Sequence, residues 1–127
     1  LWGMSRTTGR NEIVRAALDS IAFQIHDVIT AMEKDTGICL PVLWVDGGAT
    51  RNKYLMQFQS DILNTPVSCP EAEELSGIGA AMMAGLSRGF YDRSVFHTMG
   101  YTLFEPMMKN AERNDKLKIW QTAISRL

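Results

Sequence analysis

The sequence predicts an α/β fold in which the elements alternate as helix, strand, helix, strand, helix, with the two strands parallel. Two observations predict it. First, a segment with apolar residues at helical spacing is followed by a short apolar run that ends in glycines, as a helix followed by a strand would be. Second, a helix, a strand and a helix follow this run, joined by short connections. Two strands are too few for a stable sheet. Because the first residue is Leu1 and not Met, we expect further strands upstream, in a longer coding region.

The first helix is expected from Glu12 to about Lys34, where apolar residues recur every three or four positions. The apolar stripe is wide, so we expect this helix to be buried on a broad face. Leu40–Val45 is a short apolar run that stops at Asp46 and two glycines. A run of this length bounded by glycines is typical of a buried parallel strand.

A second helix is expected over Thr50–Leu63, ended by Asn64 in the left-handed conformation. A short strand over Pro66–Cys69 and a third helix over Leu75–Arg88 follow. The inner face of the second helix should carry Tyr54, Leu55, Phe58 and Ile62.

Beyond Gly89 the pattern weakens. Phe90–Glu105 mixes aromatic, glycine and polar residues, so an irregular connection is expected there, and Pro106 should open a last helix. Trp44 and Trp120 are both expected in the core.

Charge and cysteine content restrict the partners. Thirteen basic and fourteen acidic residues give a formal net charge of −1, which favours neither a nucleic acid nor an anionic membrane as partner. Cys39 and Cys69 are isolated, as expected for free thiols in a reducing cytoplasm. The longest apolar stretch, Gly77–Leu86, is half the length of a membrane span, so we expect a cytoplasmic chain.

The segment from Val42 to Asn52 has the chemistry of a binding loop. A strand delivers Gly47 and Gly48 at its carboxyl end and a helix starts at once, which lets backbone amides approach an anionic ligand. Asn52, about one turn into that helix, could face the same crevice. The alternative is a tight strand-to-helix turn with no ligand. Two expectations stay open for Asp46: a turn or helix-start residue, or a carboxylate that faces the ligand.

The third helix contains Gly77, Gly79 and neighbouring alanines. Glycine inside a helix costs about 1 kcal/mol relative to alanine. Two explanations stay open: tight helix-to-sheet packing, or an interface or hinge between lobes.

Three blocks in this order and spacing resemble the C-terminal domain of the FGGY carbohydrate kinases, which have an actin-like/ribonuclease H-like ATPase fold. They are Gly3-Met4 with Glu12–Asp19, Val45–Ala49 with Asn52, and Gly77–Ala81 with Ala84-Gly85-Leu86. The resemblance covers nearly the whole chain. It implies that residues 1–127 form one truncated domain, the C-terminal part of the nucleotide-binding domain.

The resemblance also implies residue roles. Gly48 would give a backbone amide to the phosphates of ATP, Gly47 and Ala49 would shape the loop, and Asn52 would bind the adenosine end. The general base and most of the substrate pocket would lie upstream, so no catalytic residue and no metal ligand is assigned here. Asp61 is expected only to cap or solvate the second helix.

Within the family, Met56–Leu63 is close to the run of the branch that phosphorylates glycerol. The expected full-length reaction transfers phosphate from ATP, with Mg²⁺, to a small polyol or ketose, glycerol being favoured. A pentulose such as xylulose, a non-kinase actin- or Hsp70-like ATPase, and a pure interaction domain are the alternatives. Its own N-terminal domain and a second copy of the chain are the expected protein partners, and the isolated chain should be inactive as a kinase.

Overall fold

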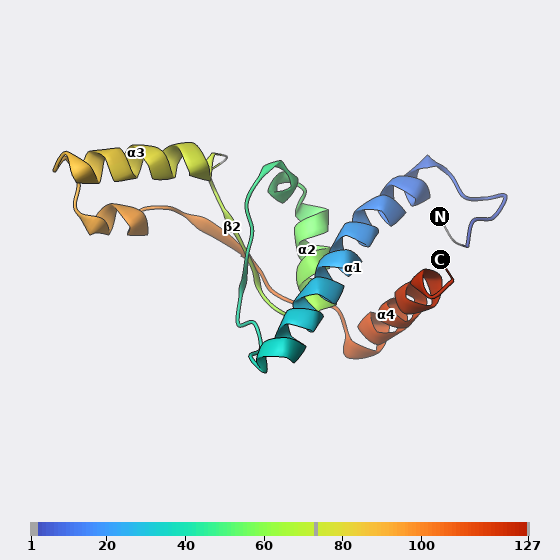
Figure 1. Cartoon of the computed structure of the whole chain (residues 1–127). Helices are drawn as coiled ribbons and strands as arrows, with labels where there is room; N and C mark the ends of the chain where they lie inside the picture. The colour runs from blue at the N-terminus through green and yellow to red at the C-terminus, as the bar shows by residue number, and fades with distance from the viewer. Residues whose placement is uncertain (1–2, 73, 127) are drawn as a thin grey trace.

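The computed structural model describes residues 3–72 and 74–126. A central three-stranded sheet is flanked by two packed helices, a third helix stands away from this body, and a fourth lies against the other end (Figure 1). The elements, in chain order, are α1 (Arg10–Thr36), β1 (Leu43–Trp44), the 3₁₀ helix η1 (Gly48–Arg51), α2 (Lys53–Leu63), β2 (Val67–Pro70), α3 (Leu75–Ser87), the 3₁₀ helix η2 (Arg93–His97), β3 (Tyr101–Phe104) and α4 (Asn110–Ile124).

The predicted alternation of helices and strands is confirmed through α3, including the parallel pairing of β1 with β2. Asn64 ends α2 in the left-handed conformation, as expected, and Gly37 ends α1 in the same conformation. Two boundaries differ from the prediction. β1 contains only two residues of the predicted run of six, and the predicted second helix is divided at Asn52 into η1 and α2.

The prediction of an irregular connection over Phe90–Glu105 is wrong at its end. Tyr101–Phe104 forms β3, which pairs antiparallel with β2, so the sheet is mixed in the order β1-β2-β3. The strand is only four residues long, and its sequence, Tyr-Thr-Leu-Phe, does not keep the alternation of apolar and polar residues to its end. The strand is fixed by its partner β2, which a local pattern does not reveal.

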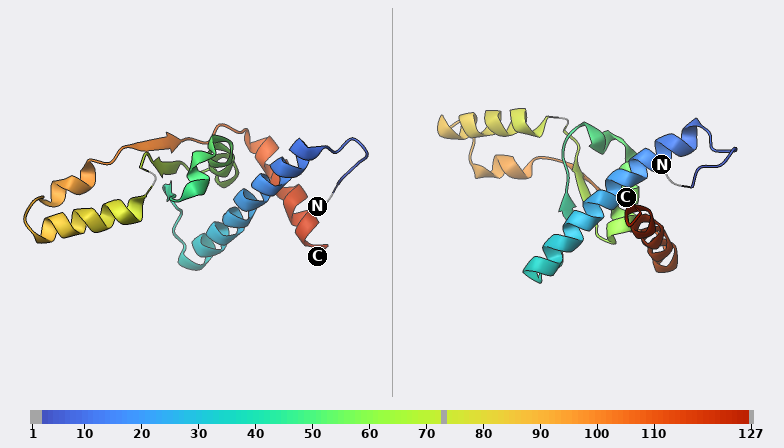
Figure 2. Two further views of the ribbon diagram at one scale, coloured as in Figure 1. Left: turned by 90° about the horizontal axis from the view of Figure 1, so that it is seen from above. Right: turned by 45° about the vertical axis from the view of Figure 1, so that its right-hand side comes forward.

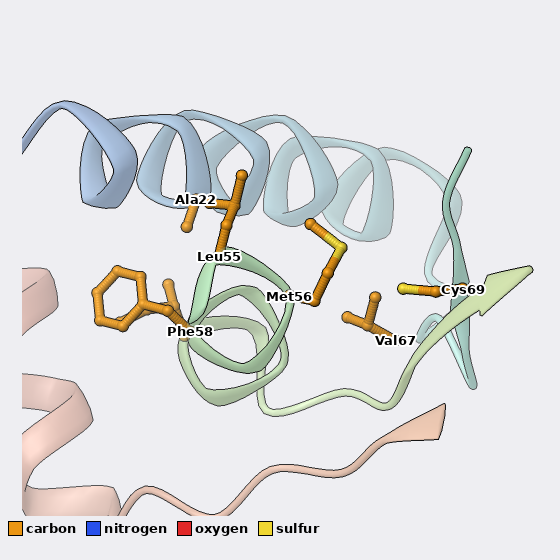
Figure 3. Packing of buried hydrophobic residues seen from close by; sticks show 7 residues of the cluster. Ala22, Leu55, Met56, Phe58, Val67 and Cys69 are labelled. Carbon is orange, nitrogen blue, oxygen red and sulfur yellow. The ribbon is translucent and has the colours of Figure 1, made fainter. Parts of the chain in front are cut away.

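The core lies between α2, the middle of α1 and the adjacent face of β2 (Figure 3). The Phe23 ring packs edge-on against Phe58 at 5.6 Å and stacks on Trp120 at 5.2 Å. The Trp120 Nε1 donates a hydrogen bond to Asp27 on α1 (2.7 Å). Three elements are joined through these rings. The buried apolar residues are Ala22, Leu55, Met56, Phe58, Ile62, Val67 and Cys69.

The expectation that α1 is buried on a broad face is wrong within this chain. Only Ala22 of α1 is fully buried, because α2 and α4 together cover only part of the helix surface. Large apolar side chains remain exposed beside that contact: Ile13, Val14, Ile21, Val28 and Met32. The prediction of a core Trp44 is also wrong, since no described element covers its face of the sheet and the ring is 63% exposed.

Asp61 does more than cap or solvate α2, which corrects the expectation for this residue. It is only 8% exposed, and its Oδ1 accepts hydrogen bonds from the backbone N–H groups of Met107 (2.6 Å) and Met108 (3.0 Å) and from Gln57 Nε2 (3.2 Å). Asp61 therefore fastens the β3–α4 connection to α2.

Candidate nucleotide-binding loop

The candidate site is the loop between β1 and α2, at the carboxyl end of β1. β1 and β2 run parallel, and Val45 N donates to Ser68 O (3.1 Å), so the pairing continues to the start of the loop. Ligands of open α/β sheets bind at this edge. The loop passes above the end of the sheet and leads into α2 (Figure 2).

Gly47 makes the turn. Its φ of 97° and ψ of 174° lie in a region that is essentially restricted to glycine. Its N–H donates to Asp46 Oδ1 (2.7 Å), and its carbonyl accepts from both the backbone N (3.0 Å) and the hydroxyl (2.8 Å) of Thr50. Asp46 here is a turn residue, as one of the two expectations had it.

Gly48 has no such conformational reason to be glycine. Its φ is not in the left-handed region, and an added Cβ would meet no atom within 4 Å. The N–H groups of Gly48 and Ala49 find no acceptor in the described part of the chain. Two adjacent amides that lack a partner, next to a position without a side chain, are the arrangement that accommodates a phosphate.

Asn52 lies at the N-cap of α2, not one turn into it. Its Oδ1 accepts from Leu55 N (3.1 Å), and its own N–H donates to Ala49 O (3.1 Å). The Nδ2 group makes no hydrogen bond to any described residue, so it keeps two donors for a ligand. The structure thus brings Gly48 and Asn52 together through the single turn of η1.

One residue beside the loop was missed by sequence reasoning. The Tyr54 hydroxyl donates to Asp19 on α1, and Arg15 lies 4.9 Å over the Tyr54 ring. Burial, and then the hydrogen bond and negative charge of Asp19, raise the pKa of Tyr54 to about 12. The contact fixes the first turn of α2 against α1. Because Asp19 is 35 residues away in sequence, no local pattern indicates it.

Metal-binding clusters and membrane-spanning helices also bear on the class of site. No group of three or more His, Cys, Asp and Glu side chains in residues 3–72 and 74–126 is arranged to hold a metal ion. Within those residues, no helix has the length and apolarity that a membrane span requires.

The fold and the loop define the class: an α/β domain with a glycine turn and two amides without partners at the carboxyl edge of parallel strands. The model of the FGGY family of carbohydrate kinases, C-terminal domain, matches residues 1–88. The chain belongs to this family.

Similar proteins are kinases of the same family. The glycerol kinase of Enterococcus faecalis is 44% identical over 129 residues, an alignment that covers 98% of this chain and 26% of that protein. The crystal structure of Plasmodium falciparum glycerol kinase with ADP matches with a TM-score of 0.84 at 37% identity, over 98% of this chain and 26% of that one. Xylulose kinase from Rhodospirillum rubrum matches with a TM-score of 0.72 at 25% identity, over 96% of this chain and 25% of that one. The chain spans about a quarter of the length of these relatives.

Proposed function

We propose that residues 1–127 are the C-terminal, ATP-binding part of a kinase whose full-length form phosphorylates glycerol. The observation that carries the proposal is the pair of amides without partners at Gly48 and Ala49, held at the sheet edge beside the Asn52 amide group. Family membership supplies the reaction class, phosphoryl transfer to a carbohydrate. Membership of this family favours a kinase over the non-kinase ATPase, and the Gly48→Val experiment below tests the pure interaction domain.

In this proposal each residue of the loop has one task. Gly47 makes the turn, the amides of Gly48 and Ala49 donate to phosphate oxygens, and the Nδ2 of Asn52 donates to the adenosine end. ATP, bound with Mg²⁺, supplies the phosphoryl group. The general base, the metal contacts and the substrate pocket belong to the part of a full-length kinase that this chain does not span. The domain would have the actin-like fold of its family, and the enzyme would work in the cytoplasm.

Glycerol is favoured over a pentulose as the substrate. The two glycerol kinases named above are 44% and 37% identical to the chain, and the xylulose kinase is 25% identical. Comparing kcat/KM for glycerol and xylulose in the full-length kinase would decide between these substrates.

The nucleotide role is tested by Gly48→Val in the full-length kinase. The side chain has room within the fold but would occupy the space proposed for a phosphate. Losing one or two charge-assisted hydrogen bonds should raise the KM for ATP about tenfold or more, with the KM for glycerol unchanged. Ala111→Leu, which adds the same three carbons at an exposed position of α4, is the control. An unchanged KM for ATP in Gly48→Val would refute the nucleotide role.

A further inference from the structure

The position of the candidate loop depends on the first turn of α2. Asn52 Oδ1 accepts a hydrogen bond from Leu55 N (3.1 Å), and the Asn52 carbonyl accepts one from Met56 N (3.0 Å). Asn52 N in turn donates to Ala49 O (3.1 Å), which ties the N-cap to a residue whose own amide has no partner in the described part of the chain. A shift or rotation of this turn would therefore move the donors of the loop.

Two kinds of contact hold that turn against α1. Leu55 and Met56 are buried, but apolar packing is not directional, so it does not by itself set the orientation of the turn. The Tyr54 hydroxyl donates to Asp19 on α1, and a hydrogen bond specifies direction as well as distance. Within residues 3–72 and 74–126, no other side chain of residues 53–56 makes a hydrogen bond to α1.

The Tyr54 ring is itself held by both helices. The Arg15 guanidinium on α1 lies 4.9 Å from the ring centroid, and Phe58 on α2 stacks on the ring with the centroids 5.8 Å apart and the planes at 11°. Arg15 Nε also lies 3.9 Å from Asp19 Oδ2, one turn along α1. The donor and its acceptor are thus both held in place, so the contact transmits the position of α1 to the first turn of α2.

We infer that Tyr54 is a positioning residue for the nucleotide: its hydrogen bond to Asp19 orients the donors of the loop before the ligand arrives. These donors are the Asn52 amide group and the N–H groups of Gly48 and Ala49. Donors that are already ordered bind a ligand more tightly than donors that must be ordered on binding. The inference rests on the proposed function and adds to it a residue that acts through Asn52.

Tyr54→Phe in the full-length kinase tests the inference, because it removes the hydroxyl and keeps the ring. Isothermal titration with ADP and Mg²⁺ measures the Kd of the nucleotide, and steady-state kinetics measures the KM for glycerol. We expect the Kd for ADP to rise about three- to tenfold, because part of the binding free energy must now order the loop. The KM for glycerol should not change.

Trp120→Phe is the matched control. It also removes an aromatic donor to an aspartate of α1, since Trp120 Nε1 donates to Asp27 (2.7 Å), but this donor belongs to α4 and not to the loop or α2. The Kd for ADP should stay unchanged in this variant. If Trp120→Phe raises the Kd as much as Tyr54→Phe does, the effect is a general loosening of the fold and the inference is wrong.

Asp19→Ala examines the same contact from α1. It should raise the Kd for ADP about as much as Tyr54→Phe, and the double variant should raise it no further, because both substitutions remove one shared interaction. Additive effects of the two substitutions would contradict the inference.

Gly48→Val separates a failure of this inference from a failure of the proposed function. If Gly48→Val weakens ADP binding and Tyr54→Phe does not, the loop binds nucleotide without help from Tyr54, and the inference alone is wrong. If neither substitution changes the Kd for ADP, the proposed nucleotide role is wrong and the inference is overturned with it.

Discussion

At the scale of single residues, the two adjacent glycines of the loop have different reasons to be glycine. Gly47 adopts a φ of 97°, which other residues rarely adopt, whereas Gly48 has an ordinary φ and open space where a Cβ would lie. The sequence presents them as equivalent. The structure separates a residue required by folding from one that leaves room for a ligand.

Gly47→Ala should destabilise the fold by about 1–3 kcal/mol, the cost of holding a non-glycine residue in this backbone region. Gly48→Ala is the matched control and should stay within about 0.5 kcal/mol of the parent. Urea denaturation followed by circular dichroism measures both. Equal effects of the two substitutions would contradict the assignment.

Tyr54 gives the chain a pH dependence at alkaline pH. Its pKa is raised from 10.0 to about 12, first by burial and then by the hydrogen bond and charge of Asp19. A raised pKa favours the neutral phenol in the folded state, so this contribution to stability is complete below pH 10 and is lost as the pH rises toward 12.

Tyr54→Phe should remove that loss. The urea midpoint of the parent chain should fall between about pH 10 and pH 12 more steeply than that of the variant. Absorbance at 295 nm should also show the highest tyrosine titration step in the parent and not in Tyr54→Phe. Parallel pH profiles for the two proteins would show that the Tyr54–Asp19 contact has no such effect.

At the scale of elements, α2 organises the chain through its polar residues as well as its apolar face. Gln57 Nε2 donates to Glu105 O (2.8 Å), Gln59 Nε2 to Ala22 O (3.3 Å) and Ser60 Oγ to Phe104 O (2.8 Å). These bonds connect α2 to α1 and to the end of β3. The run Met56–Leu63, which resembles the glycerol branch, therefore holds elements together in this structure.

Asp61→Ala should destabilise the chain by about 2–4 kcal/mol, because it leaves two backbone N–H groups and the Gln57 amide without their buried acceptor. Asp61→Asn keeps an acceptor oxygen at the same place and should cost less. Urea denaturation of both variants gives the comparison. If Asp61→Ala and Asp61→Asn lower the free energy of unfolding equally, the hydrogen bonds accepted by Asp61 Oδ1 are not what holds the β3–α4 connection.

At the scale of the whole molecule, the exposed apolar surfaces agree with a chain that is part of a larger assembly. The outer stripe of α1, Trp44 on β1 and Met83 on α3 expose large apolar side chains. An added Cβ at Gly77 or Gly79 would meet nothing within 4 Å, so tight helix-to-sheet packing does not explain these glycines. The remaining explanation, an interface between lobes, stays a prediction.

The local part of the fold could be predicted from the sequence and the long-range part could not. Helix spacing located α1, Asn64 located the end of α2, and the apolar run before Gly47 located β1, because these signals depend on neighbouring residues. β3 and the partners of Asp61 and Tyr54 were missed, because each depends on residues more than 30 positions away.

By itself, the sequence determined the order of helices and strands through α3, the parallel strand pair, the family and the candidate loop of Gly47, Gly48, Ala49 and Asn52. Hydrophobic periodicity and glycine placement encode these locally. Only the tertiary structure decided that β3 pairs with β2, that Asn52 caps α2 with its amide group free, and that Trp44 is exposed. The physical reason is that pairing and burial are set by which distant segments meet.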